Sequence, residues 1–172
     1  MVTFDSRVAG TPATAWDDAR LRRAPLLDTS RCPELIVFAA HPDDETLGAA
    51  GLMMKFAQRG LPVHVVVVTD GGATGEAGIA ARRSAELADS MAVLAPDARI
   101  TELGFADSRT PDDRSEIAQR IAAIIRAAAP TALLVSPWVG DGHRDHRVVA
   151  ELITEQASGR RVISYPIWMW HW

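Results

Sequence analysis

Residues 35–45 have the sequence LIVFAA followed directly by HPDDE, and this stretch decides the fold class of the chain. A short apolar run of this kind is typical of a strand buried on both faces of a sheet. A helical stretch follows it, Gly60 supplies a helix stop, and the next apolar run starts at residue 63. A strand, a helix and a second strand in this order predict a parallel sheet covered by helices.

The same alternation continues toward the C-terminus. We expect five strands, at Leu35–Ala40, Val63–Thr69, Ile100–Gly104, Thr131–Ser136 and Val162–Trp168. Three stripes of residues at helical spacing are expected to face the core: Leu47, Ala50, Met54 and Ala57, then Ser84, Leu87, Met91 and Leu94, then Ile117, Ile121, Ile124, Ile125 and Ala128. A last helix is expected over about 144–156. The sequence therefore predicts an α/β, Rossmann-like three-layer fold with a mostly parallel sheet in a single domain.

The first 33 residues have a different composition from the rest. They are polar, are interrupted by three prolines, and contain one candidate short helix around 13–23. We expect a lead-in segment over 1–33 and one domain over 34–172, since 172 residues suit a single core. The apolar aromatic run from Tyr165 to Trp172 is expected to need cover, from further chain beyond a truncated C-terminus or from a homo-oligomer interface.

Composition excludes several classes of protein. The net charge of -4 and the single lysine argue against a nucleic-acid surface. Cys32 is the only cysteine, so neither an intramolecular disulfide nor a cysteine-rich zinc site is expected. No segment has the ~20 apolar residues of a membrane span, and no secretory leader is recognisable. We therefore expect a cytoplasmic protein without a membrane span.

Two polar clusters follow predicted strands, at the edge of the sheet where ligands bind in α/β folds. HPDDE at 41–45 follows the first strand, and DGHRDH at 141–146 follows the fourth. Helix capping explains one or two of the acids but not His41. Adjacent carboxylates beside an imidazole favour a bound cation, and a catalytic zinc typically takes three His or carboxylate ligands. His41, one of the first two acids and one of the two later histidines would complete such a set.

A third cluster, TDGGATGEAG at 69–78, has the glycine content of a phosphate cradle. A dinucleotide fingerprint belongs after the first strand and has a different glycine spacing, so we expect a loop that could close over substrate. His64 lies inside a predicted strand and His171 near the C-terminus, and both are expected to be structural.

Five motifs in this order carry a family resemblance. They are HPDDE at 41–45, Thr69-Asp70-Gly71 with Gly75-Glu76, Arg83-x-x-Glu86-Leu87, Leu103-Gly104-Phe105 with Asp107, and His143-x-Asp145-His146. With these motifs the chain resembles the PIG-L, or LmbE-like, family of zinc-dependent N-deacetylases, which includes the GlcNAc-phosphatidylinositol deacetylase. The resemblance spans most of the chain.

The resemblance implies an activity and a role for each site residue. It implies a hydrolase that removes the acetyl group of a small N-acetylated amino sugar or conjugate, giving acetate and a free amine. It also implies one zinc ion, or another divalent metal, held by His41, Asp44 and His146. By the same resemblance Asp43 is the general base, His143 stabilises the oxyanion or protonates the leaving amine, Asp145 orients or tunes His143, and Arg83 and Asp107 contact the sugar. For Arg83 and Asp107 a surface salt bridge is the competing interpretation.

Three other functions are compatible with parts of the sequence. The same metal site would serve a hydrolase of another amide or an ester. A catalytically silent, metal-stabilised scaffold would carry the same ligands. A non-catalytic Rossmann-type nucleotide-binding module would leave His41, Asp43, His143 and His146 unexplained, and it needs a phosphate loop that the first strand does not supply.

Overall fold

The structure is a computed structural model that describes residues 9–16 and 23–169. Its elements in chain order are η1 (Ala13–Ala15), β1 (Leu35–Ala39), α2 (Asp44–Gln58), β2 (Val63–Thr69), α3 (Ile79–Leu94), β3 (Arg99–Phe105), α4 (Arg114–Ala127), β4 (Leu133–Pro137), α5 (Arg144–Gln156) and β5 (Val162–Tyr165). All five predicted strands are present, and β2 and α5 have the predicted bounds.

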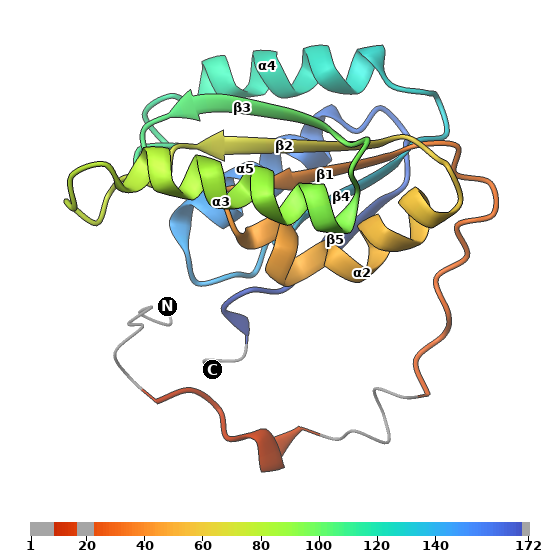
Figure 1. The fold of residues 1–172 in the computed structure, drawn as a ribbon, viewed down its shortest axis with the longest axis horizontal. Helices are drawn as coiled ribbons and strands as arrows, with labels where there is room; N and C mark the ends of the chain where they lie inside the picture. Colours follow the sequence, from red (N-terminus) through yellow and green to blue (C-terminus); the bar gives the residue numbers. More distant parts are fainter. Residues whose placement is uncertain (1–8, 17–22, 170–172) are drawn as a thin grey trace.

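The strands form one parallel sheet in the order β3-β2-β1-β4-β5 (Figure 1). The chain runs outward from β1 to β3, then returns to place β4 on the other side of β1. The strand order therefore reverses between β1 and β4, and the loops that follow these two strands diverge to opposite faces of the sheet. This is the place where α/β sheets bind ligands, at the carboxyl ends of the strands.

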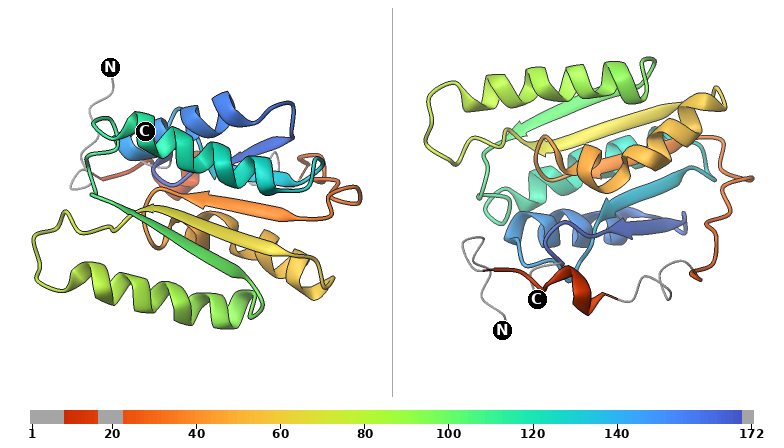
Figure 2. Two further views of the ribbon diagram at one scale, coloured as in Figure 1. Left: turned by 90° about the horizontal axis from the view of Figure 1, so that it is seen from above. Right: turned by 60° about the horizontal axis from the view of Figure 1, so that its bottom comes forward.

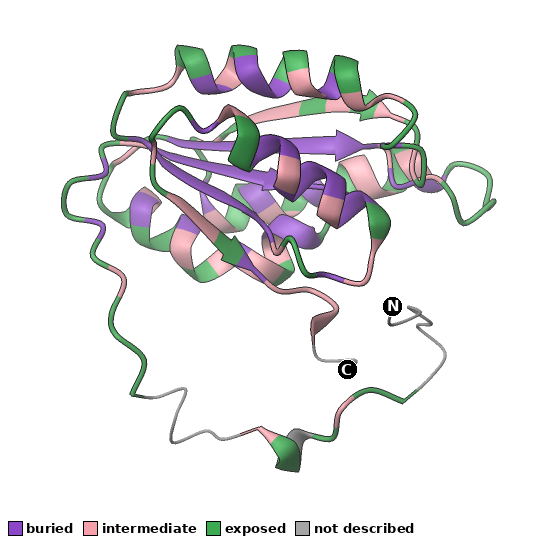
Figure 3. Ribbon diagram, turned by 180° about the vertical axis from the view of Figure 1, so that it is seen from behind, coloured by how far each residue is buried: buried purple, intermediate pink, exposed green. Residues whose placement is uncertain are grey.

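Helices cover both faces of the sheet, which gives three layers (Figure 2). Residues 35–40, which include β1, alternate between two separate cores. Leu35, Val37 and Ala39 pack with residues of α2 and α3, whereas Ile36, Phe38 and Ala40 pack with residues of α4 and α5. Figure 3 shows the result, with buried residues along the central strands and on the inward faces of the helices. The predicted α/β fold with a parallel sheet is confirmed.

The predicted core face of α2 is wrong at Leu47 and Met54, whereas Ala57 of the same stripe packs against the core. Leu47 is 72% exposed and Met54 is 39% exposed, whereas Met53 and Phe56 are fully buried. Nearly every position from 47 to 57 is apolar, so helical spacing fits more than one face of this helix. Which face of α2 is buried depends on the side by which the helix packs on the sheet, and this packing is a tertiary contact. The exposed Leu47 lies beside the site described below.

The other two stripes are confirmed at their centres. Leu87 and Met91 of α3 are buried, and so are Ile117, Ile121 and Ile125 of α4. These helices alternate apolar and polar residues more strictly than α2 does, so one face alone can enter the core.

Strand β5 ends at Tyr165, three residues before the predicted end. Pro166 follows, and proline has no N–H to donate to a strand ladder. The buried Tyr165 hydroxyl donates a 2.8 Å hydrogen bond to the Phe38 carbonyl oxygen. Its ring lies against Gly48 of α2, where any Cβ atom would overlap the ring. The end of β5 is thereby fixed beside β1 and α2.

The segment before β1 contains little regular structure within its described residues. Of the predicted helix at 13–23 the structure describes the short η1, and residues 17–22 lie outside the described ranges. Leu26 is 97% exposed. A domain boundary at residue 34 stays a prediction. Among the helices of the described residues, none is long and apolar enough to cross a membrane.

Candidate metal centre

The two predicted polar clusters meet at the point where the strand order reverses. His41 follows β1, and Asp44 is the first residue of α2. His143 precedes α5, and His146 lies in its first turn. Because β1 and β4 are neighbouring parallel strands, the segments that follow them start side by side.

Three buried donor atoms form a nearly equilateral triangle here. His146 Nε2 lies 3.3 Å from His41 Nδ1 and 3.3 Å from Asp44 Oδ2, and the latter two atoms are 3.5 Å apart. Zinc bonds of ~2.0–2.1 Å at tetrahedral angles place neighbouring donor atoms about 3.3–3.4 Å apart. The triangle therefore has the dimensions of one face of a tetrahedral site, and the donors fit a divalent ion.

Contacts around this triangle orient two of its members. His41 Nε2 lies 3.2 Å from Asp107 Oδ1 and 3.3 Å from Asp145 Oδ2. These carboxylates favour a proton on Nε2, which leaves Nδ1 unprotonated and able to bind a metal. Asp44 Oδ2 accepts hydrogen bonds from the backbone N–H groups of Ala40 (3.1 Å) and His41 (3.0 Å). The chain therefore positions both side chains without help from an ion.

Asp141 is a residue to which the sequence analysis assigned no role. Its buried carboxylate lies 3.2 Å from His146 Nδ1, through Oδ1. The same oxygen accepts the His143 N–H at 2.9 Å, and Oδ2 accepts the N–H groups of Ile167 (3.3 Å) and Trp168 (3.0 Å). Asp141 thus connects His146 to the segment after β5. The expectation that a metal-binding histidine has a carboxylate partner could have identified it within DGHRDH.

The cluster stabilises positive charge. Burial alone would lower the pKa of His41, but hydrogen bonds to carboxylates, Asp107 first, raise this pKa to about 11. Burial is likewise outweighed at His146, where Asp141 and Asp44 raise the pKa to about 9. The two imidazoles hold the pKa of Asp44 well below its usual range although burial acts to raise it. In the metal-free chain protons supply the charge that these carboxylates require, and a metal ion could replace them.

Asp43 lies beside this cluster in a strained backbone conformation, with a φ of 129°. Its Oδ2 accepts a 2.7 Å hydrogen bond from Arg83 Nη2, and Arg83 Nη1 donates to the Gly71 carbonyl oxygen at 2.9 Å. Gly71 has a φ of 63°, and a Cβ atom there would lie 2.5 Å from Arg83 Nη1. Burial and the neighbouring Asp44 raise the pKa of Asp43, against the effect of Arg83. Arg83, expected to contact sugar, is thus bound to the expected base.

His143 is half-buried among the other two imidazoles. Its ring centroid lies 4.7 Å from that of His41 and 4.8 Å from that of His146. Burial and the charges of these two rings lower the pKa of His143 to about 4, although Asp145 acts to raise it. His143 is therefore neutral at neutral pH in the metal-free protein.

Asp145 and Asp107 both reach His41, from different segments. Asp145 is buried and accepts hydrogen bonds from Thr110 Oγ1 at 2.6 Å and from the Ser108 N–H at 2.7 Å. Asp107 accepts the Ala73 N–H at 3.1 Å, which ties the loop at 69–78 to the cluster. Asp145 acts to raise the pKa of His143, and its Oδ2 also lies 3.3 Å from His41 Nε2. Its role in orienting or tuning His143 stays a prediction.

All eight predicted site residues lie in one place. A cavity of about 190 Å³ is lined by seven of them together with Leu47, Ile167 and Trp168: His41, Asp43, Asp44, Arg83, Asp107, His143 and His146. Asp145 is buried under His41. Two other groups of potential ligand atoms occur here, each within 4.8 Å: His41 with His143 and His146, and His41 with Asp107 and Asp145. In the predicted set of His41, Asp44 and His146, all three edges are 3.5 Å or shorter. His64 is structural, as predicted, with its Nε2 2.9 Å from Thr101 Oγ1, and His171 lies outside the described residues.

Comparisons with known proteins identify relatives of this chain. The family model for PIG-L, GlcNAc-PI de-N-acetylase, matches residues 36–157. The diacetylchitobiose deacetylase of Thermococcus kodakarensis is 33% identical over 133 residues, which are 73% of this chain and 49% of that protein. The 1D-myo-inositol 2-acetamido-2-deoxy-alpha-D-glucopyranoside deacetylase of a Mycobacterium species is 31% identical over 167 residues, covering 80% of this chain and 54% of that protein.

A solved structure agrees with these matches. The N,N'-diacetylchitobiose deacetylase from Pyrococcus horikoshii superposes with a TM-score of 0.66 at 27% identity, over 74% of this chain and 50% of that one. The chain spans about half the length of the curated relatives it matches.

Proposed function

The chain belongs to the PIG-L family, and on this premise we propose that it is a metal-dependent N-deacetylase of an N-acetylated amino sugar or its conjugate. The observation that carries the proposal is the buried triangle of His41 Nδ1, Asp44 Oδ2 and His146 Nε2, with Asp43 and His143 lining the same cavity. The proposed products are acetate and a free amine.

We assign one divalent ion, zinc first, to the three triangle residues. When bound, the ion supplies Lewis acidity, which polarises a carbonyl group and makes a water molecule more acidic. Asp141 and the pair Asp107 and Asp145 keep the two histidines in the orientation that this binding requires.

Asp43 is the proposed general base. Its raised pKa makes the carboxylate a better proton acceptor than an aspartate with the usual pKa. Arg83 holds Oδ2, which fixes the plane of the carboxylate, and we assign the transferred proton to Oδ1. Asp43 takes this proton from the attacking water as the C–O bond forms, and it gives the proton to the amine nitrogen as the C–N bond breaks.

His143 is the proposed partner of the developing oxyanion. In the metal-free protein, burial and the charges of His41 and His146 lower its pKa to about 4. We propose that His143 is also a neutral imidazole in the metal-loaded protein, so that it donates a hydrogen bond rather than a full proton. A fixed donor of this kind stabilises the charge that develops on the carbonyl oxygen. The neutral state makes Asp43, rather than His143, the source of the proton for the amine.

The experiment that tests this function is a screen for acetate and free amine over N-acetylglucosaminides, with zinc-loaded protein. The Asp43→Asn variant and chelator-treated protein serve as controls. Stoichiometric acetate and amine that both controls lose would support the proposal. Metal binding with release of another acid or alcohol would identify a different amide or ester hydrolase, and binding without any turnover would favour a silent scaffold.

A further inference from the structure

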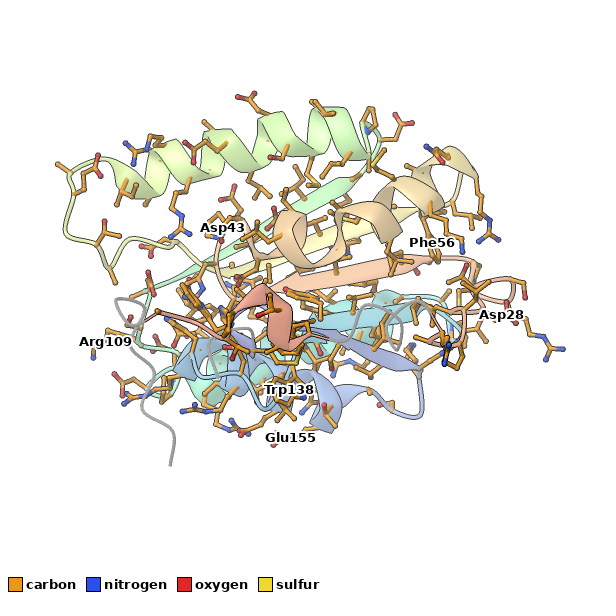
Figure 4. All side chains as sticks on the ribbon, turned by 90° about the horizontal axis from the view of Figure 1, so that it is seen from below. Asp28, Asp43, Phe56, Arg109, Trp138 and Glu155 are labelled. Carbon is orange, nitrogen blue, oxygen red and sulfur yellow. The ribbon has the colours of Figure 1, made fainter. Side chains whose placement is uncertain are left out.

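The loop that joins β3 to α4, residues 106–113, contains a buried polar residue to which no role has yet been assigned. Thr110 is 0% exposed, although the adjacent Arg109 is exposed. Its hydroxyl donates a 2.6 Å hydrogen bond to Asp145 Oδ1, and hydroxyl–carboxylate bonds of ~2.5–2.7 Å are stronger than bonds between neutral groups. In Figure 4, Arg109 lies toward the same end of the sheet as Asp43, so this loop is at the end where the metal centre lies.

The backbone of the loop fixes the position of the Thr110 hydroxyl. The Asp112 N–H donates to the Arg109 carbonyl oxygen at 2.9 Å, which closes a turn around Thr110. Ser108 has a left-handed φ of 66°, and in this conformation its N–H donates a 2.7 Å hydrogen bond to Asp145 Oδ2. Two donors from one loop therefore hold the two oxygens of the Asp145 carboxylate.

Ion pairs attach the end of the loop to α5, the helix that carries Asp145. Arg114, the first residue of α4, donates from Nη1 to Glu151 Oε2 at 2.8 Å and from Nη2 to Glu155 Oε1 at 2.6 Å. Both acceptors belong to α5, and Asp145 lies in the first turn of the same helix. The loop and α5 are thereby held against each other at the place where the Thr110 hydroxyl contacts Asp145.

Asp145 extends this contact to the metal centre. Its Oδ2 lies 3.3 Å from His41 Nε2, and His41 Nδ1 belongs to the proposed triangle. A carboxylate at the outer nitrogen of a metal-binding histidine fixes the orientation of the ring and keeps the proton on that nitrogen. The Thr110 hydroxyl binds this carboxylate, so it acts on His41 through Asp145.

We propose that Thr110 is a positioning residue of the metal centre: its hydroxyl holds Asp145 in the orientation that fixes the His41 ring for metal binding. This inference rests on the proposed function and adds to it a residue one contact beyond the carboxylate that faces the histidine. The competing interpretation is that Thr110 only fills space in the interior.

Two substitutions at this position separate the hydroxyl from the packing. Thr110→Val removes the hydroxyl and keeps the branched shape, whereas Thr110→Ser keeps the hydroxyl and removes a methyl group. Thr154→Val is the matched control, because Thr154 of α5 also donates a hydroxyl hydrogen bond, to the Ala150 carbonyl oxygen at 2.9 Å. Chemical denaturation of each metal-free variant confirms folding and measures its free energy of unfolding.

Zinc affinity, measured at one pH by competition with a chromophoric chelator, is the first readout. Thr110→Val should weaken zinc binding about 3–10-fold, less than the ~10–100-fold typical of a direct partner of a metal-binding histidine. The loss is partial because Asp107 Oδ1 still lies 3.2 Å from His41 Nε2. Thr110→Ser and Thr154→Val should keep the affinity of the unmodified protein, although Thr110→Ser should lower the free energy of unfolding because it leaves a cavity.

Two further measurements distinguish positioning from packing. In an Asp145→Ala background, Thr110→Val should cause no further loss of zinc affinity, because the hydroxyl then has no carboxylate to hold. Long-range ¹H–¹⁵N spectra of the zinc-loaded protein should show the His41 proton on Nε2, and this proton should exchange with water faster in Thr110→Val. A Thr110 that only filled space would leave this exchange unchanged.

Three results would overturn the inference and leave the metal-dependent deacetylase function standing. They are unchanged zinc affinity and proton exchange in Thr110→Val, a larger loss of affinity in Thr110→Ser than in Thr110→Val, and an undiminished effect of Thr110→Val in the Asp145→Ala background. If Thr110→Val does not fold, Thr110→Ala takes its place, since it differs from Thr110→Ser only by the hydroxyl.

The proposed function can fail separately from this inference. Zinc binding with the expected effects of Thr110→Val, but without acetate release from any N-acetylglucosaminide, contradicts the deacetylase function and supports the role of Thr110. Absence of zinc binding in the unmodified protein contradicts both.

Discussion

Metal binding at pH 6 should release about two protons per ion. His41 and His146 have pKa values raised to about 11 and about 9, so both imidazoles are protonated at this pH in the metal-free protein. Each must become neutral before its nitrogen can bind a metal. Asp44 contributes no proton, because its pKa lies well below the usual range.

The sign of the pH dependence follows from this competition. Below both histidine pKa values, protons compete with the metal for the same nitrogens, so metal affinity falls as the pH falls. With two protons displaced, the association constant should rise about a hundredfold for each pH unit between pH 5.5 and 6.5.

Titration calorimetry with zinc in two buffers of different ionisation enthalpy measures the number of released protons directly. The matched control is His143→Ala, because His143, with a pKa of about 4, is already neutral at pH 6 and is not one of the proposed ligands. This variant should still release about two protons. Binding with no proton release, or a count that falls by one in His143→Ala, would refute the assignment of ligands and protonation states.

Three substitutions separate the proposed roles. Asp43→Asn should keep the metal and lower turnover by about two to four orders of magnitude, the usual contribution of a positioned base. If Asp43→Asn loses the metal and Asp44→Asn keeps it, then Asp43 is the metal ligand and Asp44 is the base. Asp141→Ala should weaken metal binding about 10–100-fold, and unchanged affinity would argue against its link to His146. Chemical denaturation should also show a loss of about 1–3 kcal/mol in the free energy of unfolding, since three partly buried N–H groups lose their acceptor. His143→Ala should lower turnover about 10²–10³-fold at full metal content. Loss of the metal from this variant would show instead that His143 is a metal ligand.

The fold and the composition of the site could be predicted because both depend on local sequence. Each strand is a short apolar run, and the HPDDE and DGHRDH clusters directly follow β1 and β4. Once the sheet is parallel, the ends of neighbouring strands bring such clusters together. The alternation of strands and helices was therefore enough to bring the two clusters together, whereas the choice of Asp44 and His146 within them followed from the family resemblance.

Features that depend on how elements approach each other could not be predicted in this way. The face that α2 buries is one, since its sequence is apolar on several sides. The ion pair of Arg83 with Asp43 is another, because it depends on the position of α3 relative to the start of α2. The contacts of Asp141 with Ile167 and Trp168 join segments that are 26 and 27 residues apart.

The most direct test of the proposed metal centre is a crystal structure of the zinc-loaded protein with anomalous diffraction measured at the zinc edge. We expect one anomalous peak per chain, ~2.0–2.2 Å from His41 Nδ1, Asp44 Oδ2 and His146 Nε2. A peak bound instead by His41 Nε2, Asp107 and Asp145, or the absence of any peak at the triangle, would contradict this assignment.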